Sequence, residues 1–129
     1  QPMYSIAKKA IGKWAKLFIA VKIVESGNDG DNSIYARRDY NLTGMRQPRA
    51  RKTLSLGATK NKYARYASWY DCMVDFGMYL NGMEKGFIKK HHRPVRNSQE
   101  MVKYLFGKYN SHPVWRKRTL HVLKNFKWK

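Results

Sequence analysis

A single carboxylate stands at the end of a long apolar helical pattern, in the segment Ile-Val-Glu-Ser-Gly at residues 23–27. Glutamate is rarely buried without a partner, and burial raises its pKa because the charged form loses its hydration. A carboxyl group that stays protonated near neutral pH can donate a proton, as the general acid of glycosidic bond hydrolysis must. Glu25 is therefore the first candidate catalytic residue. The alternative is a solvated glutamate at a helix end.

The composition indicates a packed protein with an extreme positive charge. The 129 residues carry 27 Lys and Arg against 8 Asp and Glu, a net charge of +19. This length predicts one domain, residues 1–129. The hydrophobic fraction of 43% and the aromatic fraction of 14% exclude a disordered basic tail. The charge predicts a polyanionic partner, such as a nucleic acid, an anionic envelope polymer or a membrane surface. A generally basic, soluble surface is the alternative.

The elements that must position Glu25 follow from apolar spacing and from stop signals. Helices are predicted over residues 5–24, 68–80 and 98–109, with a last one starting near Pro113 and a short helical turn at 34–39. Ser68 and Ser98 are the expected N-caps, and Asn81-Gly82 is expected to end the second helix. Alternation over 53–56 and 63–66, around a turn at 57–61, predicts a β-hairpin. The sequence thus predicts an α+β fold with a helical body, a small β-hairpin lobe and a cleft between them.

Other reactive side chains favour no cofactor or metal. Cys72 lies on an apolar helical face, which predicts a buried, inert thiol. His91 and His92 are adjacent, so their side chains point apart and no third ligand is evident. The loop with Asp29 and Asp31 lacks the glutamate of a calcium-binding loop. No apolar run is long enough to span a bilayer. The start at Gln1 suggests a processed protein or an excised domain.

Four segments carry a family resemblance. They are Val-Glu-Ser-Gly-Asn at 24–28, the stretch from Ser-Ile-Tyr-Ala to Leu-Thr-Gly-Met-Arg at 33–46, Tyr-Ala-Arg-Tyr-Ala-Ser to Asp-Phe at 63–76, and Asn-Ser-His-Pro-Val-Trp at 110–115. In this order they resemble the glucosaminidase-type peptidoglycan hydrolases, glycoside hydrolase family 73, whose fold is lysozyme-like. The resemblance covers about residues 6–123. It implies an endo-N-acetylglucosaminidase that cleaves the β-1,4 glycosidic bond of the glycan strand.

The resemblance also implies roles for single residues. Glu25 matches the general acid, and Tyr66 matches a tyrosine that faces the cleft, where its phenol would hold a water or the N-acetyl group. Packing within the β lobe is the alternative role of Tyr66. Asp75 matches a recurrent aspartate of the family. Asn41 and Gly44 match a turn that shapes the sugar groove, although both residue types also suit a purely structural turn. The expected substrate-binding residues are Asn41, Gly44, Tyr63 and Trp69.

A second catalytic carboxylate is not evident. Glycosidases that use two carboxylates need a base or a nucleophile opposite the acid. No Asp or Glu occurs between Asp39 and Asp71, so the predicted lobe is basic. Asp75 is a candidate, and Asp29, Asp31 and Asp39 are looser ones. The substrate N-acetyl group acting as nucleophile, or a domain that has lost activity and only binds glycan, are the alternatives.

Two other classes of function compete with hydrolysis. Basic residues interleaved with Tyr63, Tyr66, Trp69 and Tyr70 suit a nucleic-acid-binding module, but the sequence has no recognised nucleic-acid motif. A structural, non-catalytic part of a phage or secretion assembly is the third class. The favoured hypothesis predicts peptidoglycan glycan strands and other anionic wall polymers as partners. It also predicts a location in the cell envelope or outside the cell, in the bacterial periplasm or wall, or in a phage particle.

Overall fold

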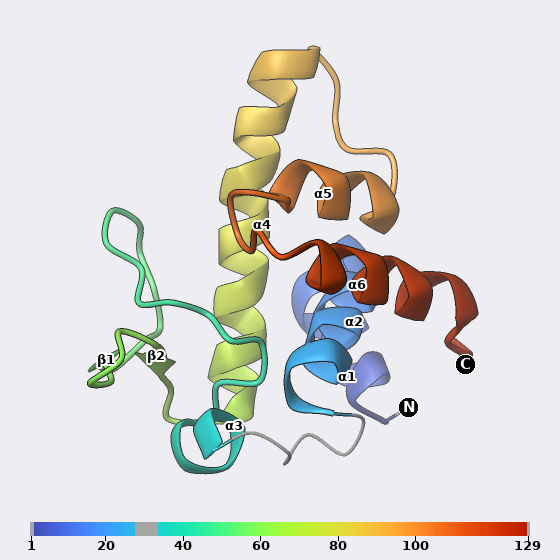
Figure 1. The fold of residues 1–129 in the computed structure, drawn as a ribbon. Helices are drawn as coiled ribbons and strands as arrows, with labels where there is room; N and C mark the ends of the chain where they lie inside the picture. The colour runs from blue at the N-terminus through green and yellow to red at the C-terminus, as the bar shows by residue number, and fades with distance from the viewer. Residues whose placement is uncertain (1, 28–33, 129) are drawn as a thin grey trace.

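The computed structural model describes residues 2–27 and 34–128. In chain order the described elements are α1 (Pro2–Ile11), η1 (Gly12–Trp14), α2 (Ala15–Ser26), α3 (Ile34–Asp39), β1 (Gly57–Ala58), β2 (Ala64–Arg65), α4 (Trp69–His91), α5 (Ser98–Leu105) and α6 (Pro113–Asn125). Figure 1 shows α4 standing between two parts of the fold: α1, α2, α5 and α6 on one side, and the lobe with β1 and β2 on the other. The fold is mainly helical with a small antiparallel sheet, as the sequence predicts.

The central element of the helical body is α2. Residues 17–21 of this helix have no exposed surface, so it is covered on all sides rather than along one stripe. It contacts α1, α4, α5 and α6. Phe18 packs against Phe76 of α4, with ring centroids 5.8 Å apart. This burial places the C-terminal end of α2, and therefore Glu25, at a defined position in the fold.

The helix predicted over residues 5–24 is in fact broken. Gly12 has a φ of +56°, which ends α1 and starts the single 3-10 turn of η1. Glycine adopts this left-handed conformation without the steric penalty of a side chain. After the break, the Trp14 indole nitrogen donates a hydrogen bond of 2.6 Å to Asn81 of α4. The apolar residues predicted to form one helix are therefore divided between α1 and α2, which η1 separates.

Helix α4 is longer than predicted, because it continues through Asn81-Gly82 to His91. Ser68 caps its start as expected, and accepts a hydrogen bond of 3.1 Å from the amide of Asp71. A glycine inside a helix costs only about 1 kcal/mol, which tertiary contacts beyond it can outweigh. Such contacts exist here: Glu84 pairs with Lys13 at 2.7 Å, and Phe87 is buried.

The last two helices differ from the prediction at their ends. Asn97, rather than Ser98, is the N-cap of α5, and its side chain accepts a hydrogen bond of 2.8 Å from the amide of Glu100. Helix α5 ends at Leu105 instead of near Tyr109, and Gly107 follows with a φ of +86°. Helix α6 begins at Pro113, as predicted. Tyr109 thus lies in the loop between α5 and α6.

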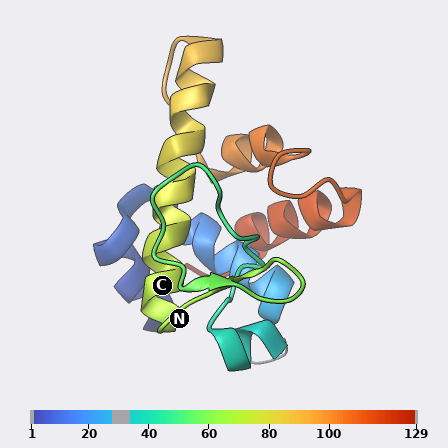
Figure 2. The ribbon, with the colours of Figure 1, turned by 90° about the vertical axis from the view of Figure 1, so that its left-hand side faces the viewer.

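The predicted hairpin is present but short. Strand β1 pairs antiparallel with β2 in the register Gly57↔Arg65 and Ala58↔Ala64, so Gly57 belongs to a strand rather than to the turn. The chain between α3 and β1 contains no helix or extended strand. In the turned view of Figure 2 it lies across α4. Side-chain hydrogen bonds hold this segment in place, and they form the support of the candidate site.

Candidate active site

Glu25 lies in the last turn of α2, at the wall of a cleft. Its side chain is half-buried, and burial raises the pKa of this carboxyl above its ordinary value. The cleft has a volume of about 250 Å³. Its lining residues come from α2, the lobe and the loop before α6: Glu25, Gly44, Arg46, Tyr63, Tyr109, Asn110, Ser111 and His112. Polar groups of three separate chain segments therefore meet around one carboxyl group whose pKa is raised by burial.

Gly44 lies directly against this carboxyl group. It has a φ of +67°, and a Cβ added at this position would lie 3.0 Å from Oε2 and 3.3 Å from Cδ of Glu25. A side chain here would meet two penalties, one from the left-handed backbone and one from the approach to the carboxyl. The residue type at position 44 therefore sets how closely the lobe can approach Glu25. Sequence reasoning expected Gly44 to shape the groove, and the structure places it directly against the Glu25 carboxyl group.

The loop at residues 41–45 brings Gly44 to this position. Asn41 is 1% exposed, and its side-chain amide donates to the carbonyls of Met45 and Ala64 at 2.9 and 3.0 Å. Its oxygen accepts a bond of 3.0 Å from the Met45 amide. Ser26, one residue after Glu25, donates to the Leu42 carbonyl. Asn41 thus holds the loop internally, while Ser26 joins the loop to α2, the helix that carries Glu25.

Tyr109 secures the same loop from the other side of the cleft. Its hydroxyl donates a hydrogen bond to the carbonyl of Thr43, the residue before Gly44. Burial of the phenol, reinforced by the nearby charge of Glu25, raises the pKa of Tyr109 well above its ordinary value. The phenol therefore stays protonated and remains a donor at neutral pH. Sequence reasoning missed this residue, because its position in the chain gave no sign that it would reach residue 43.

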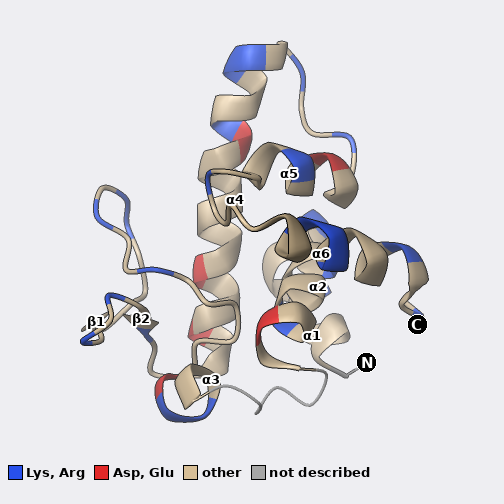
Figure 3. Cartoon of the chain, viewed as in Figure 1, with Lys and Arg blue, Asp and Glu red and all other residues tan. Residues whose placement is uncertain are grey.

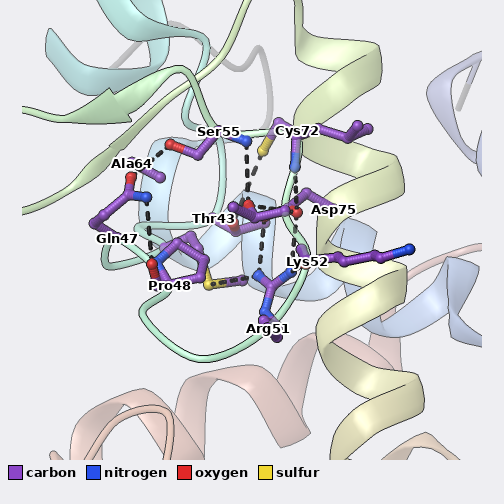
Figure 4. A network of polar contacts seen from close by, with 12 residues as sticks. Thr43, Gln47, Pro48, Arg51, Lys52, Ser55, Ala64, Cys72 and Asp75 are labelled. Atoms are coloured by element: carbon purple, nitrogen blue, oxygen red, sulfur yellow. Dashed lines mark hydrogen bonds and ion pairs between the residues drawn. The ribbon is translucent and has the colours of Figure 1, made fainter.

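Asp75 is the hub that attaches the lobe to α4. Its carboxylate is 0% exposed and accepts two hydrogen bonds of 2.9 Å from Arg51. It also accepts bonds from the hydroxyls of Thr53 and Tyr66, at 2.7 and 2.6 Å, and from the Leu54 amide at 2.9 Å. Figure 4 shows Arg51 and Asp75 facing one another at this junction. Burial alone would raise the pKa of Asp75, but these donors outweigh it and lower the pKa.

The structure separates the predicted site residues into two groups. Glu25, Gly44 and Tyr63 line the cleft, and the Tyr63 ring packs on Tyr35 with centroids 4.6 Å apart. The others are not among the lining residues: Asn41, Tyr66, Trp69 and Asp75.

Tyr66 and Trp69 were expected to contact substrate, but neither lies at the cleft beside Glu25. Tyr66 is 3% exposed and its hydroxyl is used on Asp75, so it does not face the cleft. Trp69 is half-buried at the start of α4, with its ring 6.5 Å from that of Tyr70.

Four further lining residues were not singled out as site residues from the sequence. They are Arg46, Asn110, Ser111 and His112. Arg46 lies over the Tyr63 ring, with its guanidinium carbon 4.8 Å from the ring centroid. The other three immediately precede Pro113, and the backbone amide of His112 donates to the Asn110 side chain at 2.8 Å. The 110–115 segment of the family resemblance was the available signal for them.

Among the described residues, Glu25 is the one acidic side chain that lines the cleft. Asp39 is buried and forms an ion pair of 2.8 Å with the neighbouring Arg38. The looser candidates Asp29 and Asp31 lie outside the described residues. Within the described part of the chain, no three His, Cys, Asp or Glu side chains are grouped to hold a metal ion. No helix in residues 2–27 or 34–128 has the length and apolarity to cross a membrane.

Comparison with known proteins identifies a family for the chain. Residues 1–128 match the model of the glucosaminidase family, described as mannosyl-glycoprotein endo-beta-N-acetylglucosaminidase. The structure is similar to the catalytic domain of the autolysin Auto from Listeria monocytogenes, with a TM-score of 0.62 and 17% identity over 97% of this chain and 78% of that chain. It is also similar to the glycoside hydrolase domain of FlgJ from Salmonella typhimurium, with a TM-score of 0.58 and 17% identity over 95% of this chain and 80% of that chain. No curated protein matches the sequence significantly.

These findings confirm the resemblance that the four sequence segments indicated, and with it the predicted α+β, lysozyme-like fold class. The family match extends over nearly the whole chain, so it includes the helix that carries Glu25, the lobe that carries Gly44 and the loop that carries Tyr109. The chain therefore belongs to the glucosaminidase family.

Proposed function

We propose that this protein is a peptidoglycan hydrolase that cleaves the β-1,4 glycosidic bond of the glycan strand, with Glu25 as the general acid. The observation that carries the proposal is the half-buried Glu25 carboxyl, whose pKa is raised by burial, at the wall of a polar cleft. A general acid must hold its proton until the leaving oxygen takes it, and a pKa raised by burial favours the protonated form that this role needs. The family description, an endo-beta-N-acetylglucosaminidase, supports this bond type.

The substrate assignment rests on the family and on charge. The similar structures are an autolysin and a glycoside hydrolase domain, and a net charge of +19 favours a polyanionic surface such as a bacterial wall. Coulomb attraction would raise the local concentration of the protein at such a surface and would weaken with salt. The corresponding location is outside the cytoplasm, at the cell envelope.

The second catalytic group comes either from the substrate or from residues 28–33. In the first case the acetamido oxygen of the sugar attacks its own anomeric carbon while the glycosidic bond breaks and Glu25 protonates the leaving oxygen. Water then attacks the same carbon, opens the resulting ring and returns a proton to Glu25. In the second case Asp29 or Asp31 supplies the carboxylate. Separate Asp29→Asn and Asp31→Asn variants distinguish these cases. A loss of about 10²-fold or more in kcat in one variant assigns that carboxylate, whereas near-parental kcat in both supports the acetamido group.

We propose different parts for the other predicted site residues. Tyr63 lines the cleft and binds substrate. Asn41, Tyr66 and Asp75 are positioning residues: Asn41 holds the 41–45 loop, and the pair Tyr66–Asp75 holds the lobe on α4. Trp69 remains a predicted substrate-binding residue that lies apart from the cleft beside Glu25. The positioning residues would thus act by fixing the lobe and the loop around Gly44, and the substrate-binding residues by contact with the glycan.

The test is digestion of purified peptidoglycan, with identification of the new reducing ends by mass spectrometry. We expect N-acetylglucosamine ends, and a fall in kcat of about 10²- to 10⁴-fold for Glu25→Gln. Glu100→Gln is the matched control, because Glu100 also lies on a helix but pairs with Arg93 away from the cleft. Products that persist at parental rate in Glu25→Gln would move the acid elsewhere. Absence of products from the parent protein, together with tight, salt-sensitive DNA binding, would favour a nucleic-acid-binding module.

A further inference from the structure

A second cavity lies next to the cleft beside Glu25, between the lobe and α4. It has a volume of about 380 Å³, and it shares three lining residues with the first cleft: Gly44, Arg46 and Tyr109. Beyond these, its lining includes the 48–51 segment of the lobe, Tyr79 and Met83 of α4, and Lys108. Because the two cavities share a wall at Gly44, a polymer whose glycosidic bond lies at Glu25 can continue into the second cavity.

The lining of this second cavity is strongly cationic. It contains Arg46, Arg49, Arg51 and Lys108, and no Asp or Glu of the described residues. The charge of Arg51 is compensated by its ion pair with Asp75 at 2.9 Å. None of the ion pairs formed within residues 2–27 and 34–128 includes Arg46, Arg49 or Lys108. We call the cavity with these three cations and the walls Tyr79 and Met83 the cationic arm.

The aromatic contacts of the arm leave its positive charge uncompensated. Arg46 lies over the Tyr63 ring at 4.8 Å, and the Lys108 ammonium lies over the Tyr104 ring at 4.3 Å. A ring fixes the direction of a cation but supplies no net negative charge. Figure 3 shows the same asymmetry over a wider area, with no acidic position on the segment between α3 and β1 or on the loop between α5 and α6.

Binding of a neutral sugar chain does not require a cavity lined by cations. Hydroxyl and acetamido groups need hydrogen-bond partners, and three uncompensated cations around one cavity are complementary to carboxylates. In peptidoglycan the carboxylates belong to the short peptides attached to the glycan strand. We propose that the cationic arm binds the carboxylates of the peptide carried by the sugar next to the scissile bond. This inference rests on the proposed function, because it takes the glycan to be the polymer that lies at Glu25.

The experiment measures binding, so that it can be interpreted even if no hydrolysis occurs. Wall sacculi stripped of phosphate polymers are prepared in two forms, one untouched and one with its carboxyl groups converted to amides. Co-sedimentation gives the apparent Kd of the Glu25→Gln protein, which should digest the sacculi at least about 10²-fold more slowly, and of two double variants in that background. The arm variant is Arg49→Gln with Lys108→Gln. The control is Arg65→Gln with Lys85→Gln, which removes the same charge from exposed positions that line neither cavity.

We expect the arm variant to bind untouched sacculi about two- to thirtyfold more weakly than its parent, as expected for two exposed ion pairs. The apparent Kd of the control should stay within about twofold of that of its parent. A twofold change is a small effect, because a tenfold change in Kd corresponds to about 1.4 kcal/mol. On amidated sacculi the parent should already bind weakly, and the arm variant should lose nothing further. Equal losses in both double variants, or the same loss on amidated sacculi, would overturn the inference.

Two further outcomes separate peptide binding from phosphate binding and from the proposed hydrolysis. A loss that appears only with sacculi retaining their phosphate polymers would assign the arm to phosphate and overturn the peptide assignment. Failure of the parent protein to release products refutes the proposed function and leaves the binding comparison intact. Thermal melting of each double variant shows whether it is folded. If a double variant is not folded, the single variants Arg49→Gln and Arg65→Gln make the same comparison.

Discussion

Replacing Gly44 by alanine should damage the active site with the smallest possible change in the chain. The added methyl group would lie 3.0 Å from Oε2 of Glu25, which is closer than an ordinary van der Waals contact. The φ of +67° adds the left-handed strain of a residue with a Cβ, about 1–2 kcal/mol. We therefore expect Gly44→Ala to lower the free energy of unfolding by about 1–2 kcal/mol and to displace the Glu25 carboxyl by a few tenths of an ångström or more.

The structure offers a matched control in Gly12. Its φ is +56°, so alanine there carries nearly the same backbone strain, but an added Cβ would have no heavy atom within 4 Å. Both variants should lose similar stability in urea unfolding. In the peptidoglycan digestion assay, Gly44→Ala should lose about ten- to a hundredfold in kcat, as expected for a misplaced catalytic group, and Gly12→Ala should keep the parental kcat.

The comparison of the two alanine variants is decisive because it separates strain from contact. Equal activity of Gly44→Ala and Gly12→Ala would refute the reasoning that Gly44 positions the acid. Loss of activity in both, in proportion to lost stability, would show that backbone strain rather than the approach to Glu25 is responsible.

Two further predictions concern stability and its dependence on pH. Asp75→Asn should lower the free energy of unfolding by up to about 3–5 kcal/mol, because Arg51, whose side chain is 24% exposed, loses the buried carboxylate that pairs with it. The pKa of Asp75 is lowered, so its contribution is present above its ordinary value of 3.8 and is lost as the pH falls through the folded-state pKa. The deficit measured by urea unfolding should therefore shrink between pH 7 and pH 2, and a constant deficit would contradict the ionised hub. Glu25→Gln should have the opposite sign. The raised pKa destabilises the fold as the pH rises above the ordinary value of 4.5, so the variant should be more stable than its parent at pH 8 and equally stable at pH 3.5. A less stable variant at pH 8 would mean that the ionised carboxylate is stabilised by the fold.

The helix ends show where local signals were sufficient and where they were not. Ser68 caps α4 and Pro113 starts α6, because a capping oxygen and a fixed φ act within one turn of the chain. The stop signal at Asn81-Gly82 was overridden, since its preference is worth about 1 kcal/mol and the contacts of the following turns are worth more. The break at Gly12 was not predicted, because the apolar spacing continues across it.

The candidate site divides in the same way. Glu25 was singled out as a candidate because a carboxylate at the end of an apolar helix is unusual in so basic a chain, and that feature can be read from neighbouring residues. Tyr66 and Asp75 were each predicted to act in the cleft, but neither is among its lining residues, and their hydrogen bond to one another depends on how the chain after β2 lies against α4. Tyr109 had no local signal at all, since its partner Thr43 is 66 positions away.

The sequence by itself determined the helical body, the basic lobe and the family, and it singled out Glu25 as the candidate acid, because each depends on residue types and spacings within single segments or on the order of such segments. The tertiary structure alone decided what faces the acid. Gly44, Tyr109 and the cationic arm reach the neighbourhood of Glu25 only when the lobe is fastened to α4 and the 41–45 loop is tied to α2. These contacts join residues far apart in the chain, and their geometry depends on the packing of whole elements rather than on the preferences of any single segment.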